Sequence, residues 1–99
     1  MEGMSRILVT EEIAEGGLDR LRAAGHEVVV DTDLSRLDEN IRSANALIIR
    51  SATQVTASVL EAAEQLVVVG WAGIGLDNVD VTAATARGVM VVNAPQSNI

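Results

Sequence analysis

Residues 46–70 read ALIIRSATQVTASVLEAAEQLVVVG, and this stretch decides the fold. Its two short apolar runs, Ala46–Arg50 and Leu66–Gly70, are typical of buried strands. Between them, Thr56 is positioned to cap a helix. The inner face of that helix would consist of three apolar residues: Val59, Leu60 and Ala63. A strand, a helix and a second strand at this spacing predict a right-handed crossover between parallel strands.

The same alternation of strands and helices extends towards both ends of the chain. Further apolar runs predict strands at Arg6–Thr10, Glu27–Val30 and Val89–Val92. Helical periodicity predicts helices at Ile13–Ala24, 34–44 and Val79–Arg87. Gly25 and Gly88 stand where helix ends favour a left-handed residue, and Asp33 or Ser35 could cap the second helix. Together these units predict an α/β fold with a doubly wound, five-stranded parallel sheet in the order 2-1-3-4-5.

Length and composition restrict the class of protein. The 99 residues allow one domain, 1–99, whose core is built from aliphatic side chains because Trp71 is the only aromatic residue. Fourteen acids against seven arginines give a net charge of −7, which argues against a nucleic-acid partner. Without lysine or cysteine, and with one histidine, the chain offers no P-loop, no thiolate nucleophile and no metal site built on several histidines. No apolar stretch approaches the roughly 18 residues of a membrane span, so we expect no membrane partner and a cytoplasmic location.

The sequence ends soon after the fifth predicted strand, without a further helix. An open parallel sheet needs helices on both faces. We therefore expect part of one apolar face to be left uncovered, to be filled by another copy of the chain or by a missing segment. The domain would then be a truncated part of a larger unit.

Ligands of such a sheet are expected beyond the carboxyl ends of the strands, near the switch in strand order. Arg50 leaves directly from the end of the third strand, and its guanidinium suits a carboxylate or a phosphate. Ser51 and Thr53 would add hydroxyl groups and free backbone N–H groups. The glycine-rich stretch Gly70–Gly75 follows the neighbouring strand and could form an anion nest. These loops predict a pocket for a small anion, although Arg50 could instead pair with an acid while the glycines only make the turn.

The same glycines do not form a dinucleotide-binding fingerprint. From Gly73 the order is G-I-G-L-D-N, so that Asn78 replaces the third glycine. About twenty residues on, Asn93 stands where an acid would bind the ribose. We therefore expect no cofactor to bind this chain alone.

Other polar residues have simpler structural interpretations. His26 begins the second strand, at the end of the sheet away from the predicted site. Glu11 and Glu12 follow the first strand as the acids of a receiver domain do, but the lysine and the third-strand aspartate of that domain are missing. Four acids are expected to cap helices or to lie on a solvated helical face: Asp77, Asp80, Glu61 and Glu64. Trp71 could fill the core, line the pocket or lie at an interface.

Four segments resemble the D-2-hydroxyacid dehydrogenase family, and in particular its phosphoglycerate dehydrogenases. They are IIRSAT at 48–53, GWAGIGLDNVD at 70–80, AATARGV at 83–89 and VVNAPQSN at 91–98. Their order and spacing are those of the family, and the resemblance runs from the first strand to the end of the sequence.

The resemblance implies a two-lobed enzyme, in which a Rossmann NAD-binding lobe is inserted into a flavodoxin-like substrate-binding lobe. This chain would be the amino-terminal part of the substrate-binding lobe. The catalytic residues of the family would belong to the missing NAD-binding lobe, so none is expected here. With NAD, the full-length enzyme would oxidise 3-phosphoglycerate to 3-phosphohydroxypyruvate in serine biosynthesis, and it would be a homo-oligomer such as a dimer.

The resemblance also assigns roles to individual residues. The substrate-binding residues would be Arg50, Ser51, Ala52, Thr53, Ala72 and Gly73. Of these, Ala72 and Gly73 would offer backbone N–H groups to the substrate's carboxylate, while Ile74 would meet the nicotinamide edge of the cleft. Two positions depart from the family pattern: Trp71 stands where an arginine associated with the substrate's phosphate is usual, and Ile74 where threonine or valine is common.

Two hypotheses follow for the function. In the first, the chain is a substrate-binding lobe that binds a small anionic 2-hydroxy acid weakly and cannot transfer hydride without its NAD-binding lobe. In the alternative, it is a flavodoxin-like structural or engineered fragment that self-associates, through the uncovered sheet face and an exposed Trp71.

Overall fold

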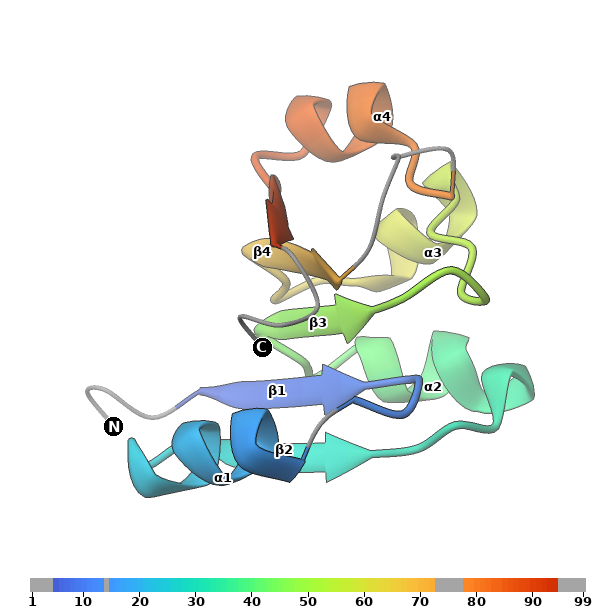
Figure 1. Ribbon diagram of the computed structural model, residues 1–99. Helices are drawn as coiled ribbons and strands as arrows, with labels where there is room; N and C mark the ends of the chain where they lie inside the picture. The colour runs from blue at the N-terminus through green and yellow to red at the C-terminus, as the bar shows by residue number, and fades with distance from the viewer. Residues whose placement is uncertain (1–4, 14, 73–77, 95–99) are drawn as a thin grey trace.

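The computed structural model describes residues 5–13, 15–72 and 78–94. In this part of the chain the strands are β1 (Arg6–Val9), β2 (Glu27–Val30), β3 (Ala46–Ile49), β4 (Val68–Ala72) and β5 (Met90–Ala94). The helices are α1 (Glu15–Ala23), α2 (Leu37–Ile41), α3 (Ala57–Ala62) and α4 (Val81–Ala86), with a 3-10 turn at Leu34–Arg36 before α2. All neighbouring strands pair in parallel, in the order β2-β1-β3-β4-β5 (Figure 1), which confirms the predicted fold.

The helices cover the two faces of the sheet unequally (Figure 1). On one face, α1 packs Leu18 against Ile7 and Val9 of β1. Successive residues of a strand point to opposite faces, and Leu8 accordingly joins the larger core on the other face, beneath α2, α3 and α4. The most buried side chains of that larger core include Leu8, Ile41, Leu47, Ile49, Leu60 and Val69.

On the α1 face, no helix of the described residues covers β4 and β5. Met90 and Val92 pair with Val68 and Gly70 and share this face with them, opposite to the larger core. Met90 is 64% exposed and Val92 is 43% exposed. Within the described part of the chain, the sheet therefore has the incompletely covered apolar surface that was expected.

Capping residues fix the ends of several helices, as the sequence predicts. Side-chain oxygens of Asp33, Thr56 and Asp80 accept hydrogen bonds from backbone N–H groups two or three residues later. Gly25 and Gly88 follow α1 and α4 with positive φ angles of 94° and 77°, which glycine adopts without strain. These residues stop the helices so that the chain can turn into β2 and β5.

Two strands are displaced from their predicted positions. The fourth strand is not Leu66–Gly70, because its pairing with β3 begins at Val68 and continues to Trp71. Leu66 is buried in the turn before the strand, and Gly70 lies inside the sheet rather than in the glycine-rich loop. β5 likewise begins and ends later than predicted.

Three helices are shorter than predicted. The first covers Glu15–Ala23 instead of Ile13–Ala24. The second begins as a 3-10 turn, in which Leu34 is 40% exposed, and α2 itself covers only Leu37–Ile41 of the predicted 34–44. The fourth begins at Val81, because Val79 first forms an isolated parallel bridge with Val55. That bridge draws the segment after β3 towards the segment that leads into α4.

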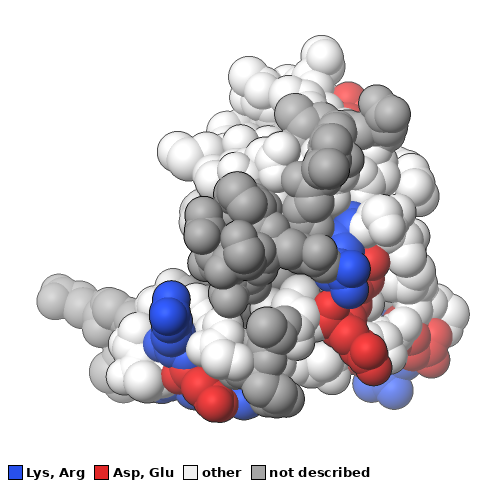
Figure 2. Space-filling view, viewed as in Figure 1, with Lys and Arg blue, Asp and Glu red and all other residues white. Residues whose placement is uncertain are grey.

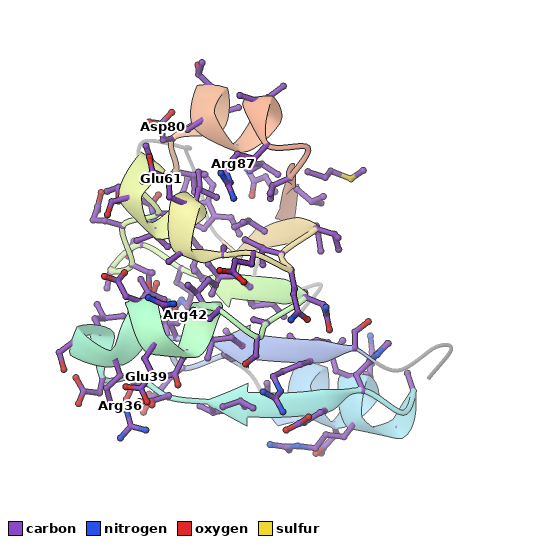
Figure 3. The ribbon with its side chains drawn as sticks, turned by 180° about the vertical axis from the view of Figure 1, so that it is seen from behind. Arg36, Glu39, Arg42, Glu61, Asp80 and Arg87 are labelled. Atoms are coloured by element: carbon purple, nitrogen blue, oxygen red, sulfur yellow. The ribbon has the colours of Figure 1, made fainter. Side chains whose placement is uncertain are left out.

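Most charged side chains in the view of Figure 2 lie in its lower half. Figure 2 shows acidic and basic groups beside one another, with no continuous basic face in that view. Six exposed charged residues lie on or next to α2, α3 and α4 (Figure 3): Arg36, Glu39, Arg42, Glu61, Asp80 and Arg87. Each helix of the described residues is too short or too polar to cross a lipid bilayer.

Candidate functional site

The carboxyl ends of β1 and β3 lie side by side, and the residues that follow them form a polar cluster. Thr10 and Glu11 follow β1, and residues 50–53, here called the 50–53 loop, follow β3. In this loop Arg50 is partly buried, Ser51 and Ala52 are exposed, and Thr53 is fully buried. The adjacency of β1 and β3 thus brings an acid and a base, 39 residues apart in sequence, to one edge of the sheet.

The carboxylate of Glu11 binds the backbone of the 50–53 loop. Its Oε2 accepts hydrogen bonds from the N–H groups of Arg50, at 2.7 Å, and Thr53, at 3.0 Å. Its Oε1 accepts a hydrogen bond from the N–H group of Ala52, at 3.0 Å. The expectation of a free backbone N–H at Thr53 is therefore wrong. From the sequence, Glu11 was noted only as following the first strand as an acid of a receiver domain does, so its role in holding this loop was missed.

These hydrogen bonds keep Glu11 charged. Burial opposes ionisation and on its own raises the pKa of the carboxyl group. The Ala52 N–H, the Thr53 hydroxyl and the N–H groups of Arg50 and Thr53 together outweigh burial, so the pKa of Glu11 lies below its usual value. Because the charged carboxylate holds three backbone N–H groups of the 50–53 loop, the loop has its conformation before any ligand binds.

Asn78 holds the same loop from its carbonyl side. The Nδ2 atom donates hydrogen bonds to the backbone oxygens of Arg50 and Thr53, both at 2.8 Å, and Asn78 is only 8% exposed. One amide group therefore fixes the spacing of two carbonyls. The sequence had indicated Asn78 only as the residue that breaks a dinucleotide fingerprint, and its structural role was missed.

Thr53 supports the loop from inside the protein. Its Oγ1 lies 2.7 Å from Oγ1 of Thr10, and both side chains are buried. Its N–H, carbonyl and hydroxyl groups are thus all engaged within the chain. Arg50 and Ser51 are the polar residues of the loop that retain exposed surface.

The guanidinium of Arg50 lies alongside the segment that follows β1. Its Nη1 donates a hydrogen bond to the backbone oxygen of Glu12, at 3.1 Å. A guanidinium carries five N–H donors, so the hydrogen bond to Glu12 uses only one of those that Arg50 has. Main-chain and side-chain contacts with Glu11 and Glu12 together define the position of Arg50.

The remaining predicted site residues belong to β4 and the segment after it. Ile49 of β3 pairs with Trp71 of β4, so Arg50 and Ala72 are the next residues along two neighbouring strands. The structure thus brings Ala72 to the same edge of the sheet as the 50–53 loop. Gly73 and Ile74 lie outside the described residues.

Trp71 is a core residue. It is 2% exposed and packs in the larger core, on the face covered by α2, α3 and α4. Its Nε1 has no hydrogen-bond partner among the described residues. Trp71 therefore fills the core, which was one of the three interpretations of this residue. The self-association hypothesis assumed that Trp71 is exposed, and this assumption is wrong.

Other polar residues have local structural roles. His26 lies at the start of β2, away from the 50–53 loop, where its Nδ1 accepts a hydrogen bond from the Ser5 N–H at 3.3 Å. Asp80 caps α4 as predicted, whereas Asp77 lies outside the described residues. Both glutamates expected on a solvated helical face are exposed: Glu61 and Glu64.

Asp31, at the carboxyl end of β2, organises the turn before α2. It accepts hydrogen bonds from the Asn40 side chain at 2.8 Å and from the Asp33 N–H at 3.0 Å, and it forms an ion pair with Arg36 at 3.1 Å. The hydrogen bonds from Asn40 and Asp33, followed by the charge of Arg36, lower the pKa of Asp31. These partners give Asp31 a structural role at the edge of the sheet.

Known proteins are similar to this chain in sequence and in fold. The chain is 47% identical over 96 residues to the D-3-phosphoglycerate dehydrogenase of Archaeoglobus fulgidus, an alignment that covers 94% of this chain and 18% of the relative. It is 51% identical over 96 residues to the chloroplastic D-3-phosphoglycerate dehydrogenase 2 of Arabidopsis thaliana, covering 94% of this chain and 15% of the relative. The chain therefore spans less than a fifth of the length of these curated relatives.

Solved structures agree with the sequence relatives. The TT0316 protein of Thermus thermophilus superposes with a TM-score of 0.81 at 34% identity, covering 87% of this chain and 29% of that protein. The NAD⁺-bound 3-phosphoglycerate dehydrogenase of Entamoeba histolytica superposes with a TM-score of 0.80 at 29% identity, covering 93% of this chain and 33% of that protein. Residues 7–99 match the family model described as D-isomer specific 2-hydroxyacid dehydrogenase, catalytic domain. The chain belongs to the D-isomer specific 2-hydroxyacid dehydrogenase family.

Proposed function

We propose that this chain is the substrate-binding lobe of an NAD-dependent D-3-phosphoglycerate dehydrogenase and does not transfer hydride without an NAD-binding lobe. The observation that carries the proposal is the 50–53 loop, in which Glu11 and Asn78 fix the main chain around Arg50. The choice of 3-phosphoglycerate as the substrate is supported by the relatives, which are named D-3-phosphoglycerate dehydrogenases. From the family resemblance, and not from those names, we further propose a cytoplasmic homo-oligomer, such as a dimer, that acts in serine biosynthesis.

The part of this chain in the reaction is to bind and orient the substrate. The planar fork of Arg50 suits a carboxylate or a phosphate, and the exposed Ser51 beside it can donate a hydrogen bond. We assign Ala52 and Thr53 to the same substrate-binding segment, Thr53 as its buried support. Ala72 and Gly73 would add backbone N–H groups, and Ile74 would adjoin the nicotinamide.

Among the described residues, the one at the last position of the fingerprint does not fit a dinucleotide. Asn78, at the position of the third fingerprint glycine, is buried, and its amide is committed to the 50–53 loop. A glycine at that position serves close packing of a helix on a strand, which an engaged asparagine side chain does not provide. We therefore assign NAD to a lobe outside this chain.

An NMR titration of the chain with 3-phosphoglycerate tests the binding role. Arg50→Ala should weaken binding by about tenfold or more, because a hydrogen bond to a charged group contributes about 1.5–3 kcal/mol. Arg42→Ala is the matched control, since Arg42 is an exposed arginine at the end of α2 and is not part of the 50–53 loop (Figure 3). Equal affinities of the Arg50→Ala variant and the unmodified chain would reject Arg50 as the binding residue.

The exposed Met90 and Val92 favour a second candidate function, a module that self-associates through its uncovered sheet face. Exposed apolar surface on a sheet favours association. Light scattering at increasing concentration tests this candidate, and Met90→Lys should reduce any association that uses this face. A chain that stays monomeric and stable at high concentration would eliminate it.

A further inference from the structure

The 50–53 loop has the form of an anion nest that is already occupied. Three backbone N–H groups, those of Arg50, Ala52 and Thr53, converge on the two oxygens of one carboxylate. Convergent main-chain N–H groups of this kind typically bind free anions. Here the anion is Glu11, supplied by the neighbouring strand of the same chain.

We propose that Glu11 is a positioning residue, which fills this nest and thereby fixes the direction in which Arg50 meets a substrate anion. The inference rests on the proposed function for the identity of the ligand. The occupancy of the nest by Glu11, however, can be tested without that ligand.

Both sides of the loop backbone are constrained once Glu11 is in place. The N–H groups bind Glu11, and the carbonyl oxygens of Arg50 and Thr53 bind Asn78. The guanidinium of Arg50 reaches the oxygen of Glu12, the residue next to Glu11. The segment after β1 therefore positions both the main chain and the side chain of Arg50.

The occupied nest also defines how a ligand can bind. Because three N–H groups of the loop are used by Glu11, an incoming carboxylate or phosphate meets the guanidinium of Arg50 and the exposed Ser51 instead. A resident carboxylate on the same chain has a high effective concentration. It therefore keeps small free anions out of the nest, so that ligand anions bind beside it.

Chemical rescue tests the occupancy of the nest. In Glu11→Ala, the backbone amide signals of Arg50, Ala52 and Thr53 should move in NMR spectra and return towards their original positions as sodium formate is added. Sodium chloride at equal ionic strength should not return them, and the control Glu61→Ala (Glu61 is exposed on α3, Figure 3) should show neither effect. The proposal would be overturned if the amide signals are unchanged in Glu11→Ala, or if they move in this variant but do not return when formate is added.

The positioning role is tested by affinity for 3-phosphoglycerate. Glu11→Ala should lose affinity by about tenfold, and formate should restore part of it, since a charge-assisted contact is replaced by the added anion. A formate response of the amides with unchanged affinity would overturn the positioning role. If the unmodified chain binds no 3-phosphoglycerate, the proposed function fails, while the formate response still decides whether Glu11 fills the nest.

Two further measurements apply if Glu11→Ala does not fold. Glu11→Gln keeps the shape of the side chain but only one acceptor oxygen, so it should weaken some of the three amide hydrogen bonds and leave others. In the unmodified chain, hydrogen exchange of the Arg50, Ala52 and Thr53 amides should be slow if Glu11 holds them. Rapid exchange of all three would overturn the proposal.

Discussion

Replacement of Asn78 by alanine should destabilise the protein by about 2–4 kcal/mol. Two hydrogen bonds to backbone carbonyls, both at 2.8 Å, are lost, and the one to the Arg50 carbonyl contributes about 1 kcal/mol net. The carbonyl of Thr53 is in the buried interior, so it cannot turn to water and adds a penalty of about 1–3 kcal/mol. The carbonyl of Arg50 is only partly buried and can be solvated.

Trp71 provides the assay for this change. It is 2% exposed in the folded chain, so its fluorescence should shift to longer wavelength when urea unfolds the protein. With a denaturant slope of about 2 kcal/mol per molar urea, the middle of the usual range, Asn78→Ala should lower the unfolding midpoint by about 1–2 M. Asn40→Ala is a control of the same residue type, because it loses only one hydrogen bond, to the partly buried carboxylate of Asp31, and leaves no backbone carbonyl without its donor.

The reasoning fails if Asn78→Ala is no less stable than Asn40→Ala. Such a result would mean that water or a neighbouring group satisfies the two carbonyls as well as the amide does. The 50–53 loop would then be positioned mainly by Glu11, and its amide signals in Asn78→Ala would remain where they are in the unmodified chain.

Two further predictions concern pH and backbone conformation. Because the folded-state pKa values of Glu11 and Asp31 are lowered, their stabilisation should be complete above their unfolded pKa values, about 4, and should disappear as the pH falls through the folded values. Urea midpoints from pH 7 to pH 3 check this, and an equally steep decline in Glu11→Gln would contradict the contribution of Glu11. Gly88→Ala should cost about 1 kcal/mol, because the φ angle of 77° strains any residue with a Cβ atom. Gly16→Ala should instead stabilise α1 by about 0.5–1 kcal/mol, since its Cβ would meet open space; thermal unfolding of both variants checks the opposite signs.

The sequence was sufficient to predict the fold because periodicity and crossover handedness are local rules. Five apolar runs separated by helical periods allow few arrangements, and the strand order found is the one predicted. The start of the fourth strand could not be predicted, because the apolar run Leu66–Gly70 has no internal boundary. Its first paired residue, Val68, is determined by the partner strand β3.

The candidate site was predicted less completely, for a physical reason. Arg50 was identified because its position at a strand end can be read locally. Glu11 and Asn78 form hydrogen bonds with main-chain groups 25 to 42 residues away. Every residue has these backbone groups, so the residue types at the partner positions do not indicate such a hydrogen bond. One signal was available for Glu11: it follows β1, which neighbours β3 in the predicted order, so the two loops had to meet.

The charges at the site limit how strongly this chain can bind 3-phosphoglycerate by itself. The phosphate of that ligand carries about −1.5 to −2 at pH 7, and the carboxylate adds a further unit. To balance these negative charges, the 50–53 loop has only the single positive charge of Arg50, and the negative carboxylate of Glu11 is bound to the backbone N–H of the same residue. Trp71, where the family resemblance implies an arginine, is an uncharged residue buried in the core. Under the proposed function, the remaining positive charge has to come from outside the 50–53 loop and is assigned to the lobe that this chain lacks, so tight binding of 3-phosphoglycerate to the isolated chain would contradict this assignment.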